Sequence, residues 1–289
     1  MIGLILAGGA GTRLGPVTKV VSKQLIPVFD KPMIFYPLSL MMASGIRKIV
    51  LIVTPRDILS YKTLLGDGSA WGIEIFYTTQ DSPKGLPEAF LLARDFIRGE
   101  SCTLILGDNI LYGSGLGAKL LGNQISRGAH VYGYLVNDAS PFGVLNLDES
   151  GKILSLVEKP QLQGRGFAIP GVYHFDSTVT ARAETLKPSE RGELEMVDLL
   201  KLYLEDEMLS YSKLDRGIAW LDTGTINDLS MAAELVKVVQ SRQGMLIGSP
   251  DEVAYRMGWI TKAQLLINAA MYAGSLYEKS LIDISLDES

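Results

Sequence analysis

Residues suited to binding a polyanion are concentrated near the start of the chain, at positions 6–27, LAGGAGTRLGPVTKVVSKQLIP. This stretch contains three glycines, Gly8, Gly9 and Gly11. Because glycine has no Cβ, the backbone there can take positive φ values and bring its N–H groups close to an anion. Arg13 can bind two phosphate oxygens at once, and Lys23 adds a mobile positive charge. This stretch therefore predicts a phosphate site, with an ordinary tight turn as the alternative interpretation of the glycines.

Two familiar phosphate motifs do not fit this loop. A Walker loop needs a lysine followed by Ser or Thr at a fixed distance from the glycines, and none stands there. In a dinucleotide fingerprint, Leu14 would occupy the position of the third glycine. Asp30 lies at about the distance of that fingerprint's ribose-binding acid, but Asp30-Lys31-Pro32 is typical of a helix N-cap followed by a first-turn proline. We therefore expect Asp30 to be an N-cap.

Two aspartates close apolar stretches further along the chain. Asp108 follows TLILG, and Asp222 follows IAWL. Ligands of open α/β sheets bind at the carboxyl ends of strands, and two carboxylates beside a triphosphate suit Mg²⁺. A turn is the competing interpretation of Gly107-Asp108, and the sequence alone does not show that the two aspartates converge.

Four other polar residues have chemistry that fits a sugar phosphate or a base. In KILSLVEKP, Lys159 could hold a phosphate and Glu158 could accept hydrogen bonds from sugar hydroxyls; a solvated ion pair is the alternative. Arg191 is either a further phosphate contact or part of a surface ion pair. Gln80 carries an amide that matches the imide edge of a pyrimidine, or it is a surface residue.

Composition excludes several classes of protein. The 289 residues, 47% hydrophobic, suffice for one large α/β domain, and the net charge of −5 argues against nucleic-acid binding. No apolar run approaches the roughly 20 residues of a membrane span, and the apolar start fits a first strand better than a signal peptide. The single Cys102 excludes an intramolecular disulfide and suits the cytoplasm. We expect His130 and His174, the two histidines, to be packed strand residues rather than catalytic or metal-binding groups.

The elements that must position these residues alternate in the first half of the chain. Strands are expected at 2–6, 48–53, 73–78, 103–106 and 131–135, with helices at 33–44, 86–98 and 116–127, which indicates βαβ units on a mostly parallel sheet. Shorter strands then follow at 143–147, 153–157, 171–175 and 208–213, with a helix at 197–205, and indicate an inserted mixed-sheet region. The last part is helical, at 228–242, 250–257 and 261–273. Its apolar residues fit a core, or alternatively an oligomer contact.

Six ordered segments together resemble the sugar-nucleotide pyrophosphorylases, in particular the tetrameric bacterial enzymes that use dTTP and glucose 1-phosphate. The segments are GGAGTRLGPVTKVVSKQLIPVFDKPMI, QDSPKGLPEAF, LGDNILYG, LVEKP, RGELE and WLDTGT. The resemblance implies one nucleotidyltransferase domain over 1–289, with a Rossmann-like, GT-A-like sheet flanked by helices. It further implies a nucleotide-binding part at 1–130, a sugar-phosphate-binding part at 131–225, and C-terminal helices at 226–289 that form an oligomer or regulatory interface.

The resemblance also implies roles for individual residues. The nucleotide would contact Gly8, Gly9, Gly11, Thr12, Arg13, Lys23, Gln80, Gly85 and Asp108. The sugar phosphate would contact Phe142, Gly143, Glu158, Lys159, Ile169, Tyr173 and Arg191. Mg²⁺ would bind to Asp108 and Asp222, and these two aspartates would form the catalytic set together with Arg13, Lys23 and Lys159.

The implied reaction joins dTTP and glucose 1-phosphate to give dTDP-glucose and pyrophosphate, a first step towards deoxysugars, in a cytoplasmic homotetramer without nucleic-acid or membrane partners. A phosphate monoester with a second pKa near 6 is already ionised at neutral pH, so no histidine base is needed. The alternatives are an enzyme that also or instead uses UTP, and an inactive nucleotide-sugar-binding regulator.

This sequence departs from the pattern of these enzymes in three places. Pro141-Phe142-Gly143-Val144 replaces the usual Arg-Tyr-Gly-Val, which removes a hydroxyl and a cation beside the sugar. Pro170 replaces a common threonine, and Tyr112-Gly113-Ser114 replaces Tyr-Gly-His. These changes leave open the range of sugars accepted and the retention of a second, regulatory nucleotide site.

Overall fold

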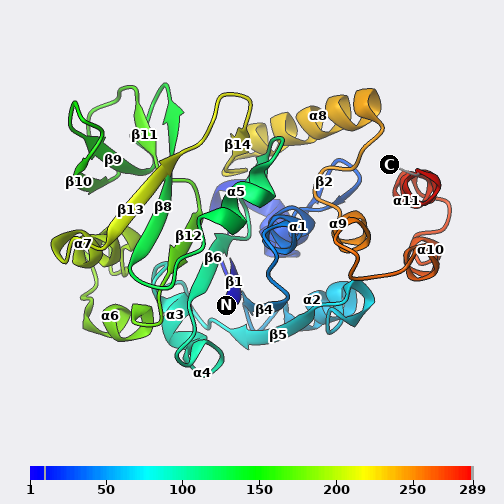
Figure 1. Cartoon of the computed structure of the whole chain (residues 1–289), viewed down its shortest axis with the longest axis horizontal. Helices are drawn as coiled ribbons and strands as arrows, with labels where there is room; N and C mark the ends of the chain where they lie inside the picture. Colours follow the sequence, from blue (N-terminus) through cyan, green and yellow to red (C-terminus); the bar gives the residue numbers. More distant parts are fainter. Residues whose placement is uncertain (10, 288–289) are drawn as a thin grey trace.

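A ten-stranded sheet forms the centre of the protein in the computed structural model, which describes residues 1–9 and 11–287 (Figure 1). Four parallel strands make up one part of this sheet, in the spatial order β5, β4, β1 and β6. Their bounds are Ile2–Ala7 for β1, Lys48–Val53 for β4, Glu74–Thr79 for β5 and Cys102–Leu106 for β6. Strand β1 is buried along its whole length, as expected of a parallel strand covered on both faces.

The other part of the sheet is mixed and continues from β6. Strand β12 (Val172–Phe175) pairs antiparallel with β6 and with β8 (Ala129–Val136), and β13 (Leu209–Lys213) pairs parallel with β8. Beyond β8 the order is β11 (Gly166–Ala168), β9 (Gly143–Leu147) and β10 (Ile153–Glu158), all in antiparallel pairs. The predicted α/β fold with a mixed-sheet region is confirmed, and the two parts share one continuous sheet.

Helices cover both faces of the sheet, because alternate side chains of its strands point to opposite sides. Ile5 packs in a core cluster with α1 (Phe35–Ala43), α2 (Ile58–Leu65) and α5 (Leu116–Gly122). Its neighbour Leu4 packs in a second cluster, with α3 (Glu88–Leu92), α4 (Arg94–Ile97), α6 (Val179–Thr185) and α7 (Met196–Glu205).

Short elements complete the chain. They are the 3-10 helices η1 (Thr12–Lys19), η2 (Lys23–Leu25) and η3 (Ser69–Trp71), the hairpin of β2 (Pro27–Val28) and β3 (Lys31–Pro32), and the two-stranded ladder of β7 (Ile110–Tyr112) and β14 (Ala219–Leu221). None of these was expected from the sequence pattern, because each is too short to show a hydrophobic period.

Several expected boundaries differ from the structure. The helix expected at 86–98 is divided at Ala93 into α3 and α4, and the one expected at 116–127 ends at Gly122. The prediction that Asp30 is an N-cap is wrong. Asp30 lies in the turn between β2 and β3, and α1 begins only at Phe35, after Ile34 as its N-cap.

The C-terminal helices are α8 (Ile226–Gln243), α9 (Pro250–Arg256), α10 (Lys262–Ala270) and α11 (Leu276–Leu286). Each begins after a Ser or Thr whose hydroxyl accepts a hydrogen bond from a backbone N–H of the first turn, at Thr225, Ser249, Thr261 and Ser275. Such caps stabilise a helix by about 1 kcal/mol. No helix in the described part of the chain has the length and apolar character to cross a membrane.

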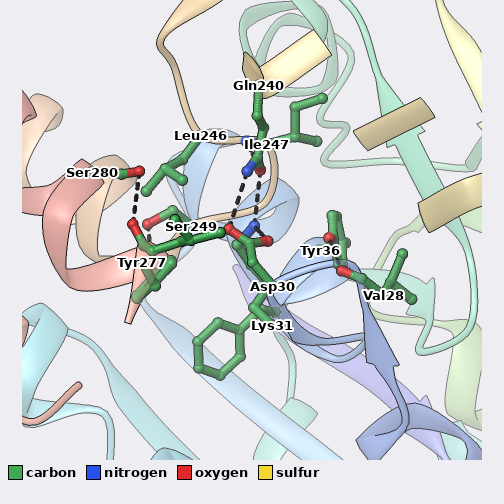
Figure 2. A network of polar contacts seen from close by, with 12 residues as sticks. Val28, Asp30, Lys31, Tyr36, Gln240, Leu246, Ile247, Ser249, Tyr277 and Ser280 are labelled. Atoms are coloured by element: carbon green, nitrogen blue, oxygen red, sulfur yellow. Dashed lines mark hydrogen bonds and ion pairs between the residues drawn. The ribbon is translucent and has the colours of Figure 1, made fainter. Parts of the chain in front are cut away.

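A buried polar network ties these helices to the N-terminal half, and it explains the position of Asp30 (Figure 2). Lys31 Nζ donates to Asp30 Oδ1 at 2.6 Å and to Gln240 Oε1 at 2.9 Å, and Gln240 Nε2 donates to Asp30 Oδ2 at 3.0 Å. Burial lowers the pKa of Lys31, while Asp30 opposes that shift. The hairpin that carries this pair directly follows Lys23 and η2, so α8 helps to hold the region after the glycine-rich loop in place.

Candidate active site

Two cavities at the carboxyl ends of the parallel strands bring the predicted residues together. The larger, of about 520 Å³, is lined among others by Gly9, Arg13, Gln80, Gly85, Asp108, Phe142, Gly143, Glu158, Lys159, Ile169, Tyr173, Arg191 and Asp222. The smaller, of about 180 Å³, is lined by Gly9, Gly11, Thr12, Arg13, Lys23, Gln24, Asp108 and Gly224. Because Gly9, Arg13 and Asp108 line both, the cavities are neighbours. Of the predicted site residues, only Gly8 lines neither.

The loop after β1 uses its glycines for two different reasons. Gly11 has a φ of 59°, in the left-handed region that favours glycine, and its carbonyl accepts a hydrogen bond from Thr18 Oγ1 at 3.0 Å. Gly8 has no positive φ; instead a Cβ there would lie 2.6 Å from Gln80 Oε1. Position 8 therefore requires glycine because Gln80 approaches it closely. Gly8 itself does not line either cavity.

Asp108 and Asp222 converge because β7 and β14 pair antiparallel. Ile110 is opposite Leu221 in this ladder, so the residues before β7 and after β14 lie at the same end of it. Thr223 Oγ1 donates to the backbone carbonyl of Asp108 at 2.7 Å and joins the two segments. Burial raises the pKa of Asp222, and the charges of Asp228 and Asp108 raise it further.

Lys23 supplies the positive charge next to these acids. Its Nζ lies 2.7 Å from Asp108 Oδ2, and its side chain is only 6% exposed. Asn109 Nδ2 donates to the other Asp108 oxygen at 2.9 Å, so both carboxylate oxygens are oriented. Arg13 lies close to Gly224, where a Cβ would meet its guanidinium at 3.2 Å.

The donor set fits a hard divalent cation that shares its coordination with a substrate. Asp108 and Asp222 offer carboxylate oxygens, and Mg²⁺ is commonly held by one or two carboxylates together with substrate phosphates and water. Residues 1–9 and 11–287 contain no cluster of three or more His, Cys, Asp or Glu that could hold a metal by itself. The two aspartates therefore suit a metal that arrives with a polyphosphate.

The opposite end of the larger cavity holds the second charged group. Glu158 ends β10, opposite Gly143 at the start of β9. Lys159 follows with a φ of 44°, an uncommon value for a residue with a side chain, and its N–H donates to the Phe142 carbonyl at 3.0 Å. This bond and the strand ladder hold the turn, so that Lys159 is exposed next to the cavity.

Arg191 is held by two carboxylates at this end. Its guanidinium donates twice to Glu195, at 2.7 and 3.2 Å, and Nη2 lies 3.7 Å from Glu158 Oε1. Lys159 Nζ lies 3.8 Å from the same Glu158 oxygen. Burial raises the pKa of Glu158, and the charge of Lys159 opposes that shift. Two cations with a half-buried carboxylate can bind a phosphate and a hydroxyl group side by side.

Apolar and aromatic side chains form the wall between the two ends. The rings of Phe142 and Trp220 lie 4.7 Å apart between centroids, and Trp220 Nε1 donates to Asn109 Oδ1 at 2.6 Å. Tyr173 is buried, which raises its pKa, and Ile169 donates its N–H to the Gly143 carbonyl at 2.8 Å. Sequence reasoning missed Trp220, although it stands two positions before Asp222 in a segment already singled out.

Gln80 and Gly85 lie at the side of the cavity that faces β1. Gln80 follows β5, is only 3% exposed, and donates through Nε2 to Glu88 Oε2 at 2.7 Å. Gly85 has a φ of 102° and forms an isolated bridge with Leu194, whose backbone leaves no room for a Cβ. The 81–87 segment is thereby joined to the segment that carries Arg191 and Glu195. Glu88 and Glu195 were also missed, because each acts through a neighbour.

Both histidines lie outside the cavities described above, as expected. His174 is fully buried between Thr103 Oγ1, at 2.7 Å from Nδ1, and Tyr132 OH, at 2.9 Å from Nε2. His130 Nδ1 contacts Ser210 Oγ at 2.8 Å, and His130 Nε2 has no hydrogen-bond partner among the described residues. The chemistry of this site thus depends on carboxylates, an amide and cations.

Comparisons with known proteins identify the relatives of this chain. The family model described as "Nucleotidyl transferase" matches residues 2–238. A glucose-1-phosphate thymidylyltransferase of Xanthomonas campestris pv. campestris (strain B100) is 47% identical over 280 residues, which are 96% of this chain and 95% of that protein. A protein of the same name from Mycobacterium tuberculosis (strain ATCC 25618 / H37Rv) is 46% identical, over 98% of this chain and 99% of its own.

Solved structures show the same similarity. A Bacillus anthracis protein assigned as a glucose-1-phosphate thymidylyltransferase, in complex with sucrose, superposes with a TM-score of 0.74 and 35% identity, over 81% of this chain and 95% of that chain. A UDP-glucose pyrophosphorylase complexed with UDP-glucose has a TM-score of 0.71 at 23% identity, over 82% of this chain and 98% of that chain. The second comparison shows a shared fold alone.

Proposed function

Because the chain belongs to the nucleotidyl transferase family, we propose that it joins dTTP and α-D-glucose 1-phosphate to form dTDP-glucose and pyrophosphate. Relatives that carry the name of this activity match the chain over nearly its whole length. The observation that supports the proposal best is the arrangement of one cavity: Arg13 and the two aspartates lie at one end, and Glu158, Lys159 and Arg191 at the other. Such a cavity can hold a triphosphate and a sugar phosphate end to end.

The triphosphate binds, in this proposal, at the loop after β1. Gly9, Gly11 and Thr12 line the smaller cavity together with Lys23, and Arg13 lines both cavities. Lys23 is fixed by Asp108 at 2.7 Å, so its charge is already oriented towards the cavity. Lys23 and Arg13 then bind the β- and γ-phosphates and stabilise the negative charge of the departing pyrophosphate.

Asp108 and Asp222 would hold Mg²⁺ together with phosphate oxygens of dTTP. The family points to a divalent metal, and carboxylate oxygens next to phosphates favour magnesium among the common cations. When bound, the ion neutralises phosphate charge and makes the α-phosphorus more electrophilic.

The sugar phosphate binds at the other end, with its phosphate on Lys159 and Arg191. Glu158 accepts hydrogen bonds from sugar hydroxyls, and Gly143, Ile169, Tyr173 and Phe142 enclose the ring. A phosphate oxygen of glucose 1-phosphate attacks the α-phosphorus of dTTP, the bond from that phosphorus to the bridging oxygen breaks, and pyrophosphate leaves. The attacking oxygen is already ionised near neutral pH, so the site needs no general base. What remains for the protein is to position both phosphates and to balance their charge.

Gln80 and Gly85 recognise the base of the nucleotide. Both line the same cavity on the side of β1 and β5, and the carboxamide of Gln80 offers an acceptor and a donor to an imide. The assembly is, by the same proposal, a cytoplasmic homotetramer in which the helices at 226–289 contact neighbouring subunits. The parts at 1–130 and 131–225 supply the nucleotide and the sugar-phosphate contacts.

Pyrophosphate release tests this function. We expect release with glucose 1-phosphate and dTTP in the presence of Mg²⁺, and none after chelation of the metal. Parallel reactions with UTP, ATP, CTP and GTP measure the choice of base. No release with any nucleotide would contradict the enzymatic function, whereas equal rates with UTP and dTTP would contradict thymidine selectivity only, since one methyl group is worth about 1–3 kcal/mol.

A further inference from the structure

The side-chain amide of Gln80 is fixed by one acidic neighbour. Gln80 is 3% exposed, and its Nε2 lies 2.7 Å from Glu88 Oε2. The other Glu88 oxygen faces Lys84 Nζ at 3.6 Å, and the Glu88 side chain is 13% exposed. Glu88 is the first residue of α3, and its carboxylate lies between Gln80 and Lys84.

A carboxylate in this position allows only one orientation of the amide. An ionised carboxylate accepts hydrogen bonds and cannot donate one, so Gln80 must present its NH₂ group to Glu88 and not its carbonyl oxygen. Turning the amide by 180° would place two acceptors 2.7 Å apart in a nearly buried site. The Oε1 atom is thereby directed to the other side, beside Gly8, where a Cβ would be 2.6 Å away. No described residue donates a hydrogen bond to this oxygen.

We propose that Glu88 is a positioning residue for base selection: it locks Gln80 so that the cavity offers an acceptor and a donor in fixed places. This inference rests on the proposed function, in which Gln80 contacts the base. The imide edge of thymine or uracil presents N–H at position 3 next to a carbonyl at position 4. Cytosine presents the reverse, an acceptor at position 3 and an amino group at position 4. A locked amide therefore distinguishes imide bases from cytosine, whereas an amide that can turn accepts both.

The locked amide does not distinguish thymine from uracil, because both carry the same imide edge. Selection between these two depends on space for the methyl group, which Glu88 does not contribute. Two kinds of base selectivity are thus separable in this cavity. Loss of Glu88 should change the preference for dTTP over dCTP and leave the preference for dTTP over UTP unaltered.

The experiment measures dissociation constants of dTTP, dCTP and UTP by titration calorimetry for the wild-type protein and for Glu88→Gln, whose amide can both donate and accept. We expect the preference for dTTP over dCTP to fall about tenfold, equivalent to about 1.4 kcal/mol, and the preference for dTTP over UTP to change less than threefold. Glu88→Ala serves as a second variant with the same expectation if Glu88→Gln folds poorly. Lys84→Ala is the matched control, because Lys84 is 66% exposed and contacts only the far oxygen of Glu88.

A double variant separates positioning from a general structural effect. If Glu88 acts through Gln80, adding Glu88→Gln to Gln80→Ala should leave the preference for dTTP over dCTP unchanged within threefold. A merely structural role would weaken dTTP and dCTP equally and leave their ratio intact in every background. A wild-type protein without preference for dTTP over dCTP, or a fall of less than threefold in both Glu88 variants, overturns the inference. Absence of pyrophosphate release overturns the proposed function alone, because the binding ratios remain measurable.

Discussion

Lys23 Nζ lies 2.7 Å from Asp108 Oδ2, although 85 positions separate the two residues in the chain. Lys23 begins η2 after the glycine-rich loop, and Asp108 follows β6, which is paired with β1 in parallel. The neighbouring carboxyl ends of these two strands thus bring a buried cation to a carboxylate. This pair connects the glycine-rich loop to the aspartates, and Lys23 is the member to test first.

Replacing Lys23 by methionine should reduce kcat/KM for dTTP by about 100-fold or more, because a preorganised charge next to the phosphates is lost. The fold should survive, since Asp108 is 32% exposed and can be solvated without its partner. Pyrophosphate release and thermal unfolding measure the two effects. Lys19→Met is the matched control, because Lys19 is exposed at the end of η1 and lines neither cavity. Comparable losses in both variants would show that position 23 has no special role.

Replacing Lys159 by glutamine should raise the KM for glucose 1-phosphate about tenfold or more, since a hydrogen bond to a charged group contributes about 1.5–3 kcal/mol. The KM for dTTP should change little, because Lys159 is at the other end of the cavity from Asp108. Steady-state kinetics with each substrate varied in turn gives both values. Lys152→Gln, at an exposed position immediately before β10, serves as control. A KM for the sugar phosphate within twofold of wild type would contradict the assigned contact.

The strands of the sheet could be predicted from the sequence because their signal is local. An apolar run such as residues 48–53 shows its burial within a few positions, and the structure has β4 at those bounds. The loop glycines and the two aspartates were also visible, since each follows such a run. Their meeting was not visible: it depends on the β7–β14 ladder, whose strands are more than 100 positions apart and only three residues long.

Other features could not be predicted from the sequence, because tertiary contacts determine them and the local sequence pattern does not. Asp30 has the sequence context of an N-cap, yet its carboxylate is bound to Lys31 and to Gln240 from α8, and the helix starts five residues later. Glu88 and Glu195 look like ordinary helix-start acids in the sequence. Their importance comes only from what they hold, the amide of Gln80 and the guanidinium of Arg191.

The two buried histidines should make the protein sensitive to acid. Burial lowers the pKa of His130 to about 4 and that of His174 to about 3, against about 6.5 in the unfolded chain. Between these values the unfolded state binds more protons than the folded state, so the free energy of unfolding decreases as the pH falls below 6.5. Each histidine should therefore remove about 2 kcal/mol of stability between pH 7 and pH 5.

The variant His130→Phe tests this expectation by urea unfolding at both pH values. Between pH 7 and pH 5, the free energy of unfolding of this variant should fall by about 2 kcal/mol less than that of the wild type, because one titrating group is absent. Burial raises the pKa of Asp251, which acts in the opposite sense but equally in both proteins, so its contribution cancels in the difference. Ser39→Ala, which removes a buried hydroxyl that does not titrate, should show the wild-type pH dependence. Identical pH dependence of His130→Phe and wild type would contradict the prediction.

Removing Asp30 should destabilise the attachment of the C-terminal helices. Asp30→Ala leaves the Lys31 ammonium, 1% exposed, with Gln240 Oε1 as its remaining hydrogen-bond partner, and loss of one member of a buried pair costs about 3–5 kcal/mol. Urea unfolding measures this loss. Adding Lys31→Met should recover more than half of it, since the unpaired buried charge is then absent. Arg98→Ala is the control: it breaks an exposed pair with Asp95 and should cost less than about 1 kcal/mol. Equal losses in Asp30→Ala and Arg98→Ala would show that the network in Figure 2 contributes no more than a surface ion pair.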